Sequence, residues 1–448
     1  MAAPISITDI EFPSQSQSLS HILSDLRRST LSITNRLKSV ETDSRFVQEV
    51  AGHYGLPLVA NERCGSWYIP TQHKSGSAYF KSTDGHAGQW DFSLRRLNLQ
   101  VLDILNEHGG CIIVDSTRRG KSMPDALSKT APIWAAVMNR TLFPEEIAYR
   151  DVQFPPNFLG ASEESQIQSR IDGFVDQFKN LQLDLCSLKH RMGKPARIAW
   201  ATRDYYYPDY SDRNNFHLIV LCSASRRVRG AEMSEGGYIQ GAGDDSEGWA
   251  CGLTPDLFWK HKGILMDSRE EDLPEIIRDL TEKHRQTPSS EETTLIAPTG
   301  NIFVGNRKIL DKRTRAVGLI IDCHGDPTVS QNTQFNLGCH TGKIGSRDLR
   351  KVLDKIEEFV SINLNKDSSQ NLTIVCDTGK DLSVGVALMV LCLFFGENGV
   401  YARQKRQEPI TKQYIRQRLA WIVSSKHDVN PSRSTLQSIN WYLMERRD

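Results

Sequence analysis

The amino-terminal part of the chain carries apolar residues at the spacing of a helix. Between Ser20 and Val50 these residues are Ile22, Leu26, Ile33, Leu37, Val40, Phe46 and Val50, and arginines and lysines lie between them. Apolar positions three and four residues apart share one face of a helix. The segment is therefore predicted to form one or two amphipathic helices.

Beyond this segment, short apolar runs rich in β-branched residues alternate with helical stretches. The predicted strands are Cys111–Val114, Arg197–Thr202 and His217–Cys222, and Pro132–Arg140 is a predicted helix. Strands that alternate with helices are typical of an α/β domain. A polar segment, 286–294, follows a helix predicted to end near residue 284. We place a domain boundary there, between an N-terminal domain (1–290) and a C-terminal domain (295–448).

The C-terminal domain has the most regular pattern. Its predicted elements are a strand within 302–312, a strand at 317–323, a helix at 346–362, a strand within 372–383 and an apolar helix that runs to residue 395. This order resembles that of the dual-specificity phosphatases. In that family a strand ends in His-Cys, and after five residues an Arg and a Ser or Thr follow, so that loop amides and the next helix bind a phosphate.

The loop 376–383 keeps part of this phosphatase pattern. Cys376, Gly379 and Ser383 match it, whereas Val375 stands in place of the His and Leu382 in place of the Arg. A leucine cannot hold phosphoryl oxygens bidentately, as the arginine does. We therefore predict a loop that binds phosphate without hydrolysing it.

Charged side chains give the loop its predicted chemistry. Lys380 is its only cation, and Asp377 and Asp381 are its only candidate bases. Asp377, Thr378 and Gly379 also bear a loose likeness to the phosphate loop of phosphoribosyltransferases. A lone cysteine at a strand end is more often a small buried residue. Charges concentrated between a buried strand and an apolar helix, where amides are free, instead favour a ligand site.

A second strand, charged loop and helix occupy residues 111–134. The sequence GKS at 120–122 looks like the tail of a Walker A loop, but Asp115 stands where the first glycine is required. What remains beside the hydroxyls is a cluster of cations, Arg118, Arg119 and Lys121. Such a cluster suits the phosphates of a ligand or of an RNA backbone. A solvated turn is the alternative.

Two further features suggest ligands without deciding between function and packing. Asp244 and Asp245 lie in a glycine-rich loop, where paired carboxylates could hold Mg²⁺ together with substrate phosphates. A surface turn explains them equally well. Segments 61–70 and 79–86 mix aromatic and polar residues in a way that suits stacking on nucleic acid. Aromatic residues in a core explain them nearly as well.

Charge and cysteine content exclude several classes of protein. There are 55 Lys plus Arg against 54 Asp plus Glu, so any affinity for nucleic acid must come from local basic patches. No two of the nine cysteines form a Cys-x-x-Cys pair, which argues against a disulfide framework and a zinc site. The first residues lack the pattern of a secretory signal. The longest apolar run, Val384–Phe395, is shorter than the roughly 20 residues that cross a bilayer. No membrane contact is expected, and we predict a cytoplasmic protein.

Six motifs together resemble the initiator-tRNA phosphoribosyl transferases of fungi and plants, known as tRNA 2'-O-ribosylphosphate transferases. They are ERCGSWY, YFKSTDGH, SLRRLNL, DSTRRGKSMPDALSKTAPIW, QGAGDD and IVCDTGKDLS, and the likeness runs from about Ser44 to the carboxyl end. The resemblance implies an α/β protein with a larger N-terminal α/β domain of family-specific type and a dual-specificity-phosphatase-like C-terminal α/β domain.

The resemblance also implies a reaction. A glycosyltransferase of this family moves ribose 5-phosphate from 5-phosphoribosyl 1-pyrophosphate to the 2'-hydroxyl of a T-stem adenosine, position 64, of initiator tRNA. The added phosphate excludes this tRNA from elongation during translation. Initiator tRNA and the donor are thus the expected partners, and Mg²⁺ is expected to accompany the donor.

The site residues follow from placing this reaction on the motifs. Donor phosphates are expected at Cys376, Thr378, Gly379, Lys380, Leu382 (through its amide) and Ser383. Asp377 or Asp381 would accept the proton of the 2'-hydroxyl. Donor phosphate or tRNA is expected at Arg118, Arg119, Lys121 and Lys81, and Mg²⁺ at Asp244 and Asp245. Two alternatives remain: a phosphatase with Cys376 as nucleophile, and a catalytically altered, phosphatase-like RNA-binding protein.

Overall fold

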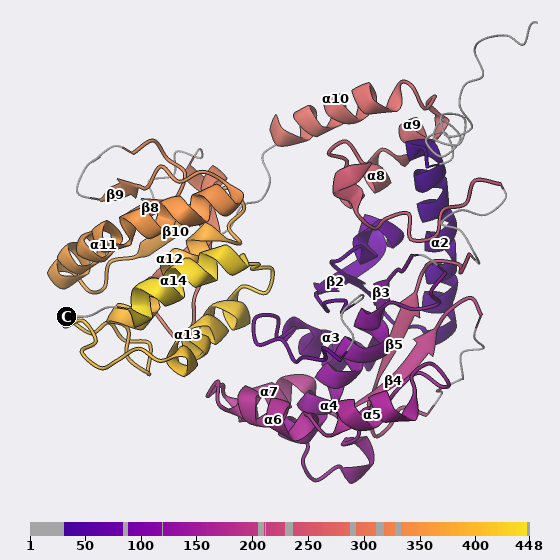
Figure 1. The fold of residues 1–448 in the computed structure, drawn as a ribbon, viewed down its shortest axis with the longest axis horizontal. Helices are drawn as coiled ribbons and strands as arrows, with labels where there is room; N and C mark the ends of the chain where they lie inside the picture. The colour runs from indigo at the N-terminus through magenta and orange to yellow at the C-terminus, as the bar shows by residue number, and fades with distance from the viewer. Residues whose placement is uncertain are drawn as a thin grey trace, which may run out of the picture.

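The chain folds into two lobes, each built on a five-stranded sheet (Figure 1). The computed structural model describes residues 31–83, 88–118, 120–204, 210, 212–228, 236–286, 293–310, 318–327 and 333–445. Strand order is β2-β1-β3-β5-β4 in the first sheet and β6-β7-β10-β8-β9 in the second. The α/β class that the sequence predicts is confirmed.

All neighbouring strands of the first sheet are parallel. Their bounds are β1 Leu58–Asn61, β2 Lys74–Ala78, β3 Gly110–Asp115, β4 Ala196–Ala201 and β5 His217–Ser223. Alternate residues enter opposite cores: Cys111 and Ile113 face one, and Ile112 and Val114 face the other. A parallel sheet buried on both faces needs such continuous apolar runs, which is why the three strands predicted in this lobe lie within one residue of those observed.

Helices cover both faces of this sheet. Residues of α2 (Ile33–Tyr54) and α8 (Pro255–Lys260) belong to one core. Residues of α3 (Gln100–His108), α4 (Ala131–Leu142), α6 (Ile171–Lys179) and α7 (Leu185–Met192) belong to the other. The lobe is completed by α5 (Ala161–Gln168), α9 (Lys262–Asp267) and α10 (Leu273–Gln286). Helix α2 confirms the predicted amphipathic helix from residue 33, while 20–30 lie outside the described residues.

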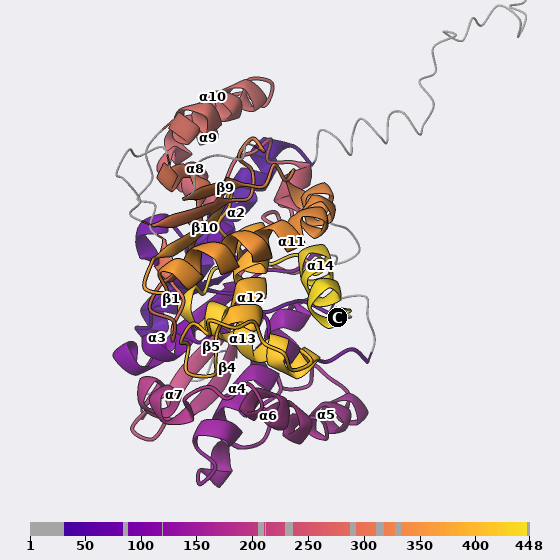
Figure 2. The same ribbon diagram turned by 90° about the vertical axis from the view of Figure 1, so that its left-hand side faces the viewer.

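The second lobe lies nearest the viewer in Figure 2. Its strands are β6 Thr294–Leu295, β7 Ile302–Asn306, β8 Leu319–Asp322, β9 Gln334–Asn336 and β10 Leu372–Cys376, and its helices are α11 Gly342–Lys366, α12 Leu382–Phe394, α13 Lys412–Ser425 and α14 Arg433–Met444. Only β6 runs antiparallel to its neighbour. Every residue of α12 is buried, so the apolar run of this helix is explained by packing. No helix within the described part of the chain is long and apolar enough to span a membrane.

Short helical turns connect these elements. They are η2 Gly65–Tyr68, η3 Thr71–His73, the π-helical turn η4 Ala126–Thr130, η5 Ile147–Tyr149, η6 Ser246–Gly248 and η7 Arg307–Leu310. All nine cysteines are free thiols, as the absence of paired spacing predicts.

The order of strands determines where ligands can bind. In the first sheet β1 lies between β2 and β3. After β1 the chain forms β2 on one side of it and then crosses to form β3 on its other side, so the strand order reverses at β1. Open parallel sheets bind ligands at the carboxyl ends of the strands that flank such a reversal. In the second sheet β10 is central, and the loop 376–383 follows its carboxyl end.

Candidate active site

The loop between β10 and α12 is a tight turn against the neighbouring strand β7. Gly379 has a φ of +66°, and a Cβ there would lie 2.7 Å from the carbonyl carbon of Gly305. The Gly379 amide donates to the Cys376 carbonyl at 3.1 Å. Glycine is therefore required both by the left-handed backbone and by the close approach. The loop ends where α12 begins at Leu382, so the free amides of that helix lie at the predicted phosphate position.

Cys376 lies in a polar environment at the base of the loop. Its Sγ is 3.1 Å from the Ser383 Oγ and 3.8 Å from the Thr378 Oγ1. Burial disfavours the thiolate, but hydrogen bonds from His324, from Ser383 and from loop amides outweigh it and lower the pKa of Cys376 to about 6. The site therefore holds a stabilised thiolate next to an imidazole.

His324 was not identified from the sequence, although it follows β8 directly. Its Nδ1 is 2.7 Å from the Cys339 carbonyl oxygen, and its Nε2 is 3.9 Å from the Asp377 Oδ2. The hydrogen bond with Cys376 is the largest cause that raises the pKa of His324. A histidine from the turn after the neighbouring strand β8 thus contacts the Cys376 thiol, while Val375 stands directly before the cysteine.

The position of the missing arginine is filled by an apolar side chain. Leu382 is only 2% exposed and lies in the hydrophobic core. The predicted contact of its amide with the donor stays a prediction. The loop consequently lacks the bidentate cation that a phosphatase uses on the transferred phosphoryl group.

The two candidate bases have different surroundings. Asp377 is half exposed and lines a cavity of about 630 Å³ at the carboxyl ends of β7 and β8, together with Arg307 and Asp322. Asp381 accepts a hydrogen bond from the Ser432 amide at 2.8 Å, directly before α14. Asp377 is therefore the carboxylate that faces open space, whereas Asp381 also holds the start of a helix.

Lys380 points away from that cavity. Its Nζ lies 3.2 Å from the Asp428 Oδ2, and the residue lines a second cavity, of about 620 Å³, between the two lobes. The two ends of one loop thus open into different spaces, and the predicted donor cation is partly neutralised by Asp428.

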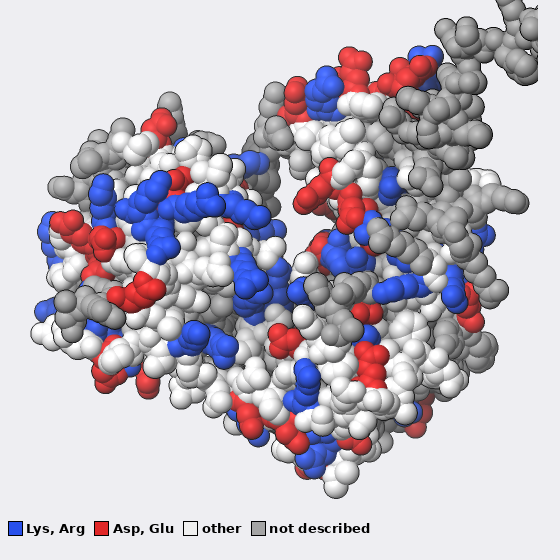
Figure 3. Space-filling model, in the orientation of Figure 1, with Lys and Arg blue, Asp and Glu red and all other residues white. Residues whose placement is uncertain are grey.

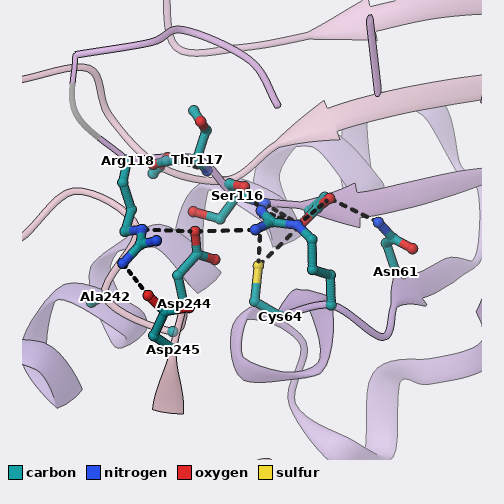
Figure 4. A network of polar contacts seen from close by, with 12 residues as sticks. Asn61, Cys64, Ser116, Thr117, Arg118, Ala242, Asp244 and Asp245 are labelled. Atoms are coloured by element: carbon teal, nitrogen blue, oxygen red, sulfur yellow. Dashed lines mark hydrogen bonds and ion pairs between the residues drawn. The ribbon is translucent and has the colours of Figure 1, made fainter. Parts of the chain in front are cut away.

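A network of charged residues lies at the carboxyl ends of β1 and β3 (Figure 4). Arg63 is central: its guanidinium is 3.1 Å from the Asp115 Oδ1 and 3.3 Å from the Asp244 Oδ2. The Asn61 side-chain Nδ2 donates to the Asp115 Oδ2 at 2.8 Å, and the Cys64 Sγ lies 3.0 Å from the same carboxylate. Asp115 is fully buried and Asp244 is 3% exposed. Sequence reasoning missed Arg63, whose partners are 52 and 181 residues away.

Arg118 belongs to this network. Its Nε is 3.5 Å from the Asp244 Oδ2, and its guanidinium also contacts Asp245. The two carboxylates predicted to hold Mg²⁺ therefore face arginines. Within the described ranges no group of three His, Cys, Asp or Glu side chains could hold a metal ion.

One atom of this network does suit a cation. The Asp244 Oδ1 is buried and has no hydrogen-bond partner among the residues that the structure describes. Burial, more than any other cause, raises the pKa of Asp244, against the effect of Arg63. Mg²⁺ is commonly held by one or two carboxylates together with substrate phosphates, so Asp244 fits a cation that arrives with the donor. The Mg²⁺ site stays a prediction.

The remaining predicted residues have different surroundings. The Lys121 carbonyl accepts a hydrogen bond from Gln240, and the Lys81 carbonyl accepts one from Thr130, while the Lys81 side chain is exposed. Arg119 lies outside the described residues. The aromatic residues of the two mixed segments are mostly core, since Trp67, Tyr68 and Phe80 are at most 3% exposed. The packing alternative is correct for these three.

The fold and the loop define a two-lobed α/β protein with a phosphatase-like lobe whose loop 376–383 lacks the arginine of phosphatases. The chain matches the family model of the Rit1 N-terminal domain over residues 26–282 and that of the Rit1 DUSP-like domain over residues 333–443. The chain belongs to the Rit1 family, which confirms the family resemblance seen in its motifs.

Relatives cover nearly the whole chain. An uncharacterized protein of Schizosaccharomyces pombe is 35% identical over 426 residues, which cover 92% of this chain and 94% of that protein. The tRNA A64-2'-O-ribosylphosphate transferase of Saccharomyces cerevisiae is 33% identical over 491 aligned positions, with 95% of each chain covered. Among solved structures, the PTP-2 phosphatase of Cydia pomonella aligns with 33% of this chain and 88% of its own, at 16% identity and a TM-score of 0.25.

Proposed function

We propose that this protein transfers ribose 5-phosphate from 5-phosphoribosyl 1-pyrophosphate to the 2'-hydroxyl of adenosine 64 in initiator tRNA, in the cytoplasm. The observation that carries the proposal is the match along nearly the whole chain to a tRNA A64-2'-O-ribosylphosphate transferase. The loop supports it independently, because it offers amides and a helix N-terminus to a phosphate and has Leu382 where a phosphatase needs arginine.

The reaction exchanges one bond at the anomeric carbon of the donor for another. The tRNA 2'-oxygen forms a bond to this carbon as the bond to pyrophosphate breaks, and the electron pair of that bond leaves with the pyrophosphate. Negative charge develops on the leaving pyrophosphate. Backbone amides that donate to this group therefore assist the reaction more than a nucleophilic side chain would. Loop 376–383 holds one phosphate group of the donor.

The proton of the 2'-hydroxyl must go to a base. Asp377 suits this role because it is half exposed, lines an open cavity and lies near the imidazole of His324. Asp381 suits it less well, since its carboxylate also holds the Ser432 amide. Mg²⁺, when bound with the donor, would neutralise pyrophosphate charge, and Asp244 is the residue proposed to hold it.

A phosphatase is the competing function, because Cys376 and His324 form an activated pair. Its missing arginine argues against it. The test is to incubate the protein with donor labelled in its 5-phosphate, Mg²⁺ and initiator tRNA, and with an aryl phosphate in a parallel reaction. Label on the tRNA without phosphate release from the aryl phosphate supports the transferase. Phosphate release without labelling of the tRNA supports the phosphatase.

A further inference from the structure

The motif SLRRLNL, residues 93–99, has no role in the reaction proposed above, yet it lies where the lobes meet. Arg96 lines the cavity of about 620 Å³ between them, together with Lys380 of the phosphate loop. Lys74 lines it too, but its Nζ is 3.0 Å from Glu62. Figure 3 shows Lys and Arg side chains gathered at this junction.

Arg96 forms a stacked pair with an aromatic ring. Its guanidinium carbon lies 3.9 Å from the centroid of the Tyr79 ring. Burial, and secondarily the charge of Arg95, lower the pKa of Arg96. No ion pair among the described residues includes Arg96. A partly desolvated guanidinium without a carboxylate partner is available to bind phosphate.

The backbone holds this pair in place without a ligand. Asn98, 6% exposed and with a φ of +52°, connects the two segments. Its Oδ1 accepts from the Tyr79 amide at 2.8 Å, and its Nδ2 donates to the carbonyls of Tyr79 and Arg96, each at 3.3 Å. The Trp134 indole donates to the Leu97 carbonyl at 2.7 Å. Since both backbones are fixed, little conformational entropy is lost when a ligand binds.

The pair is also connected to the phosphate loop. The Arg96 guanidinium donates to the Asn430 side-chain oxygen, and the Asn430 amide donates to the Lys380 carbonyl at 2.8 Å. A single residue, Asn430, therefore joins the stacked pair of the first lobe to the loop of the second.

We propose that this cavity binds one nucleotide of an RNA strand, with its base stacked on the Arg96–Tyr79 pair and its phosphate held by the Arg96 guanidinium. This proposal rests on the proposed function, which makes tRNA the substrate. Aromatic rings and arginine planes that stack an unpaired base beside a cation are how proteins read single-stranded RNA. The sugar-phosphate donor has no base, so it could use only the phosphate half of this site.

The test compares variants of the full chain for binding of initiator tRNA across a range of salt, and for binding of the donor. Arg96→Ala should weaken tRNA binding about ten- to a hundredfold and lower the salt slope by about one phosphate contact. Tyr79→Ala should weaken binding without changing the slope, because it removes no charge. Donor affinity should stay unchanged in both variants.

Arg170→Ala is the matched control. Arg170 also lies over an aromatic ring, 4.8 Å from the centroid of Trp90, but it is exposed and does not line the cavity between the lobes. This variant should bind tRNA like the wild type.

Two results would overturn the proposal. The first is that Arg96→Ala binds tRNA with the affinity and salt slope of the wild type. The second is that Arg96→Ala loses donor binding while it still binds tRNA, which would make the cavity a donor site. If Arg96→Ala does not fold, wild-type tRNA affinity in Tyr79→Ala overturns it equally. A protein that binds tRNA through Arg96 but never transfers label would refute the proposed reaction and leave the nucleotide site standing.

Discussion

At the scale of single residues, the chemistry of the phosphate loop depends on Leu382 and Cys376. Leu382 stands where a phosphatase has the arginine that holds the transferred phosphoryl group. Hydrogen bonds from His324 and Ser383 lower the pKa of Cys376. The loop thus combines an activated thiol with a leucine at the position where a phosphatase has the arginine that holds the phosphate ester.

We predict that Cys376→Ser keeps most transferase activity, because glycosyl transfer to a hydroxyl requires no thiolate. Cys392→Ser is the matched control, since Cys392 is a fully buried thiol of α12 outside the loop. Both are measured by label transfer at equal amounts of folded protein. Loss of transfer by several orders of magnitude in Cys376→Ser alone would indicate a covalent role for the thiol.

Lys380→Ala should weaken donor binding about ten- to a hundredfold while tRNA is still bound, because a charge-assisted contact to phosphate is worth about 1.5–3 kcal/mol. Lys426→Ala is its control: Lys426 contacts the same carboxylate, Asp428, at 2.7 Å but lies outside the loop. Calorimetric titration of donor with Mg²⁺ measures both. Equal donor affinity in wild type and Lys380→Ala would assign the donor phosphates to another site.

A buried carboxyl in α2 gives a prediction about pH. Burial raises the pKa of Asp43 to about 8, against hydrogen bonding from Tyr238 and the charge of Arg203. Since this pKa is higher in the folded than in the unfolded chain, the stability that Asp43 contributes is greatest below about pH 4 and is lost as pH rises through about 8.

We predict that the free energy of unfolding depends less on pH in Asp43→Asn than in the wild type. The variant should therefore be more stable relative to the wild type at pH 8 than at pH 5. Urea unfolding at both pH values measures it. A difference between the two proteins that is the same at both pH values would mean that Asp43 does not titrate in this range.

At the scale of elements, the boundaries of strands and helices were largely predictable. Buried parallel strands need continuous apolar runs, and β3, β4 and β5 appear where such runs occur. The helix at 346–362 was predicted too short: α11 extends from 342 to 366, and its buried Leu364 continues the spacing of Ile356 and Val360 beyond the predicted end.

The site was predictable only where its residues are adjacent in sequence. Loop 376–383 is continuous, so its residues could be proposed together as a site. Folding brings three other residues close to the partners with which they form hydrogen bonds, namely Arg63, His324 and Asn98. Nothing in the local sequence of these residues indicates the contacts.

One contact between distant segments stabilises a helix terminus. Both carboxylate oxygens of Glu270 accept backbone amides at the start of α2, from Ile33 and from Thr34, at 2.8 Å each. Burial opposes ionisation of Glu270, but these hydrogen bonds outweigh it and lower its pKa. The contribution is therefore present at neutral pH and lost as the pH falls below the ordinary glutamate range.

Glu270→Ala should destabilise the protein by about 1–2 kcal/mol, as the loss of a helix cap does. Glu271→Ala is the control, because Glu271 is 72% exposed and pairs only with the exposed Arg269. Urea unfolding at pH 7 measures both variants. Equal stability of the two would show that the cap contributes nothing measurable.

At the scale of the whole molecule, the two lobes supply different parts of the proposed reaction. The second lobe offers loop 376–383, the proposed phosphate site, and the first offers the buried network around Arg63 and the stacked pair at the junction. The cavity between them is lined by both lobes. Each of the two matched family models falls mainly in one lobe, at residues 26–282 and 333–443.

The central claim is tested most directly by locating the transferred group. The protein is incubated with 5-phosphate-labelled donor, Mg²⁺ and either initiator tRNA or the same tRNA with a 2'-deoxyadenosine at position 64. We predict label on nucleotide 64 of the first and none on the second, because the substitution removes only the accepting hydroxyl. Equal labelling of both RNAs, or of neither, would contradict the account.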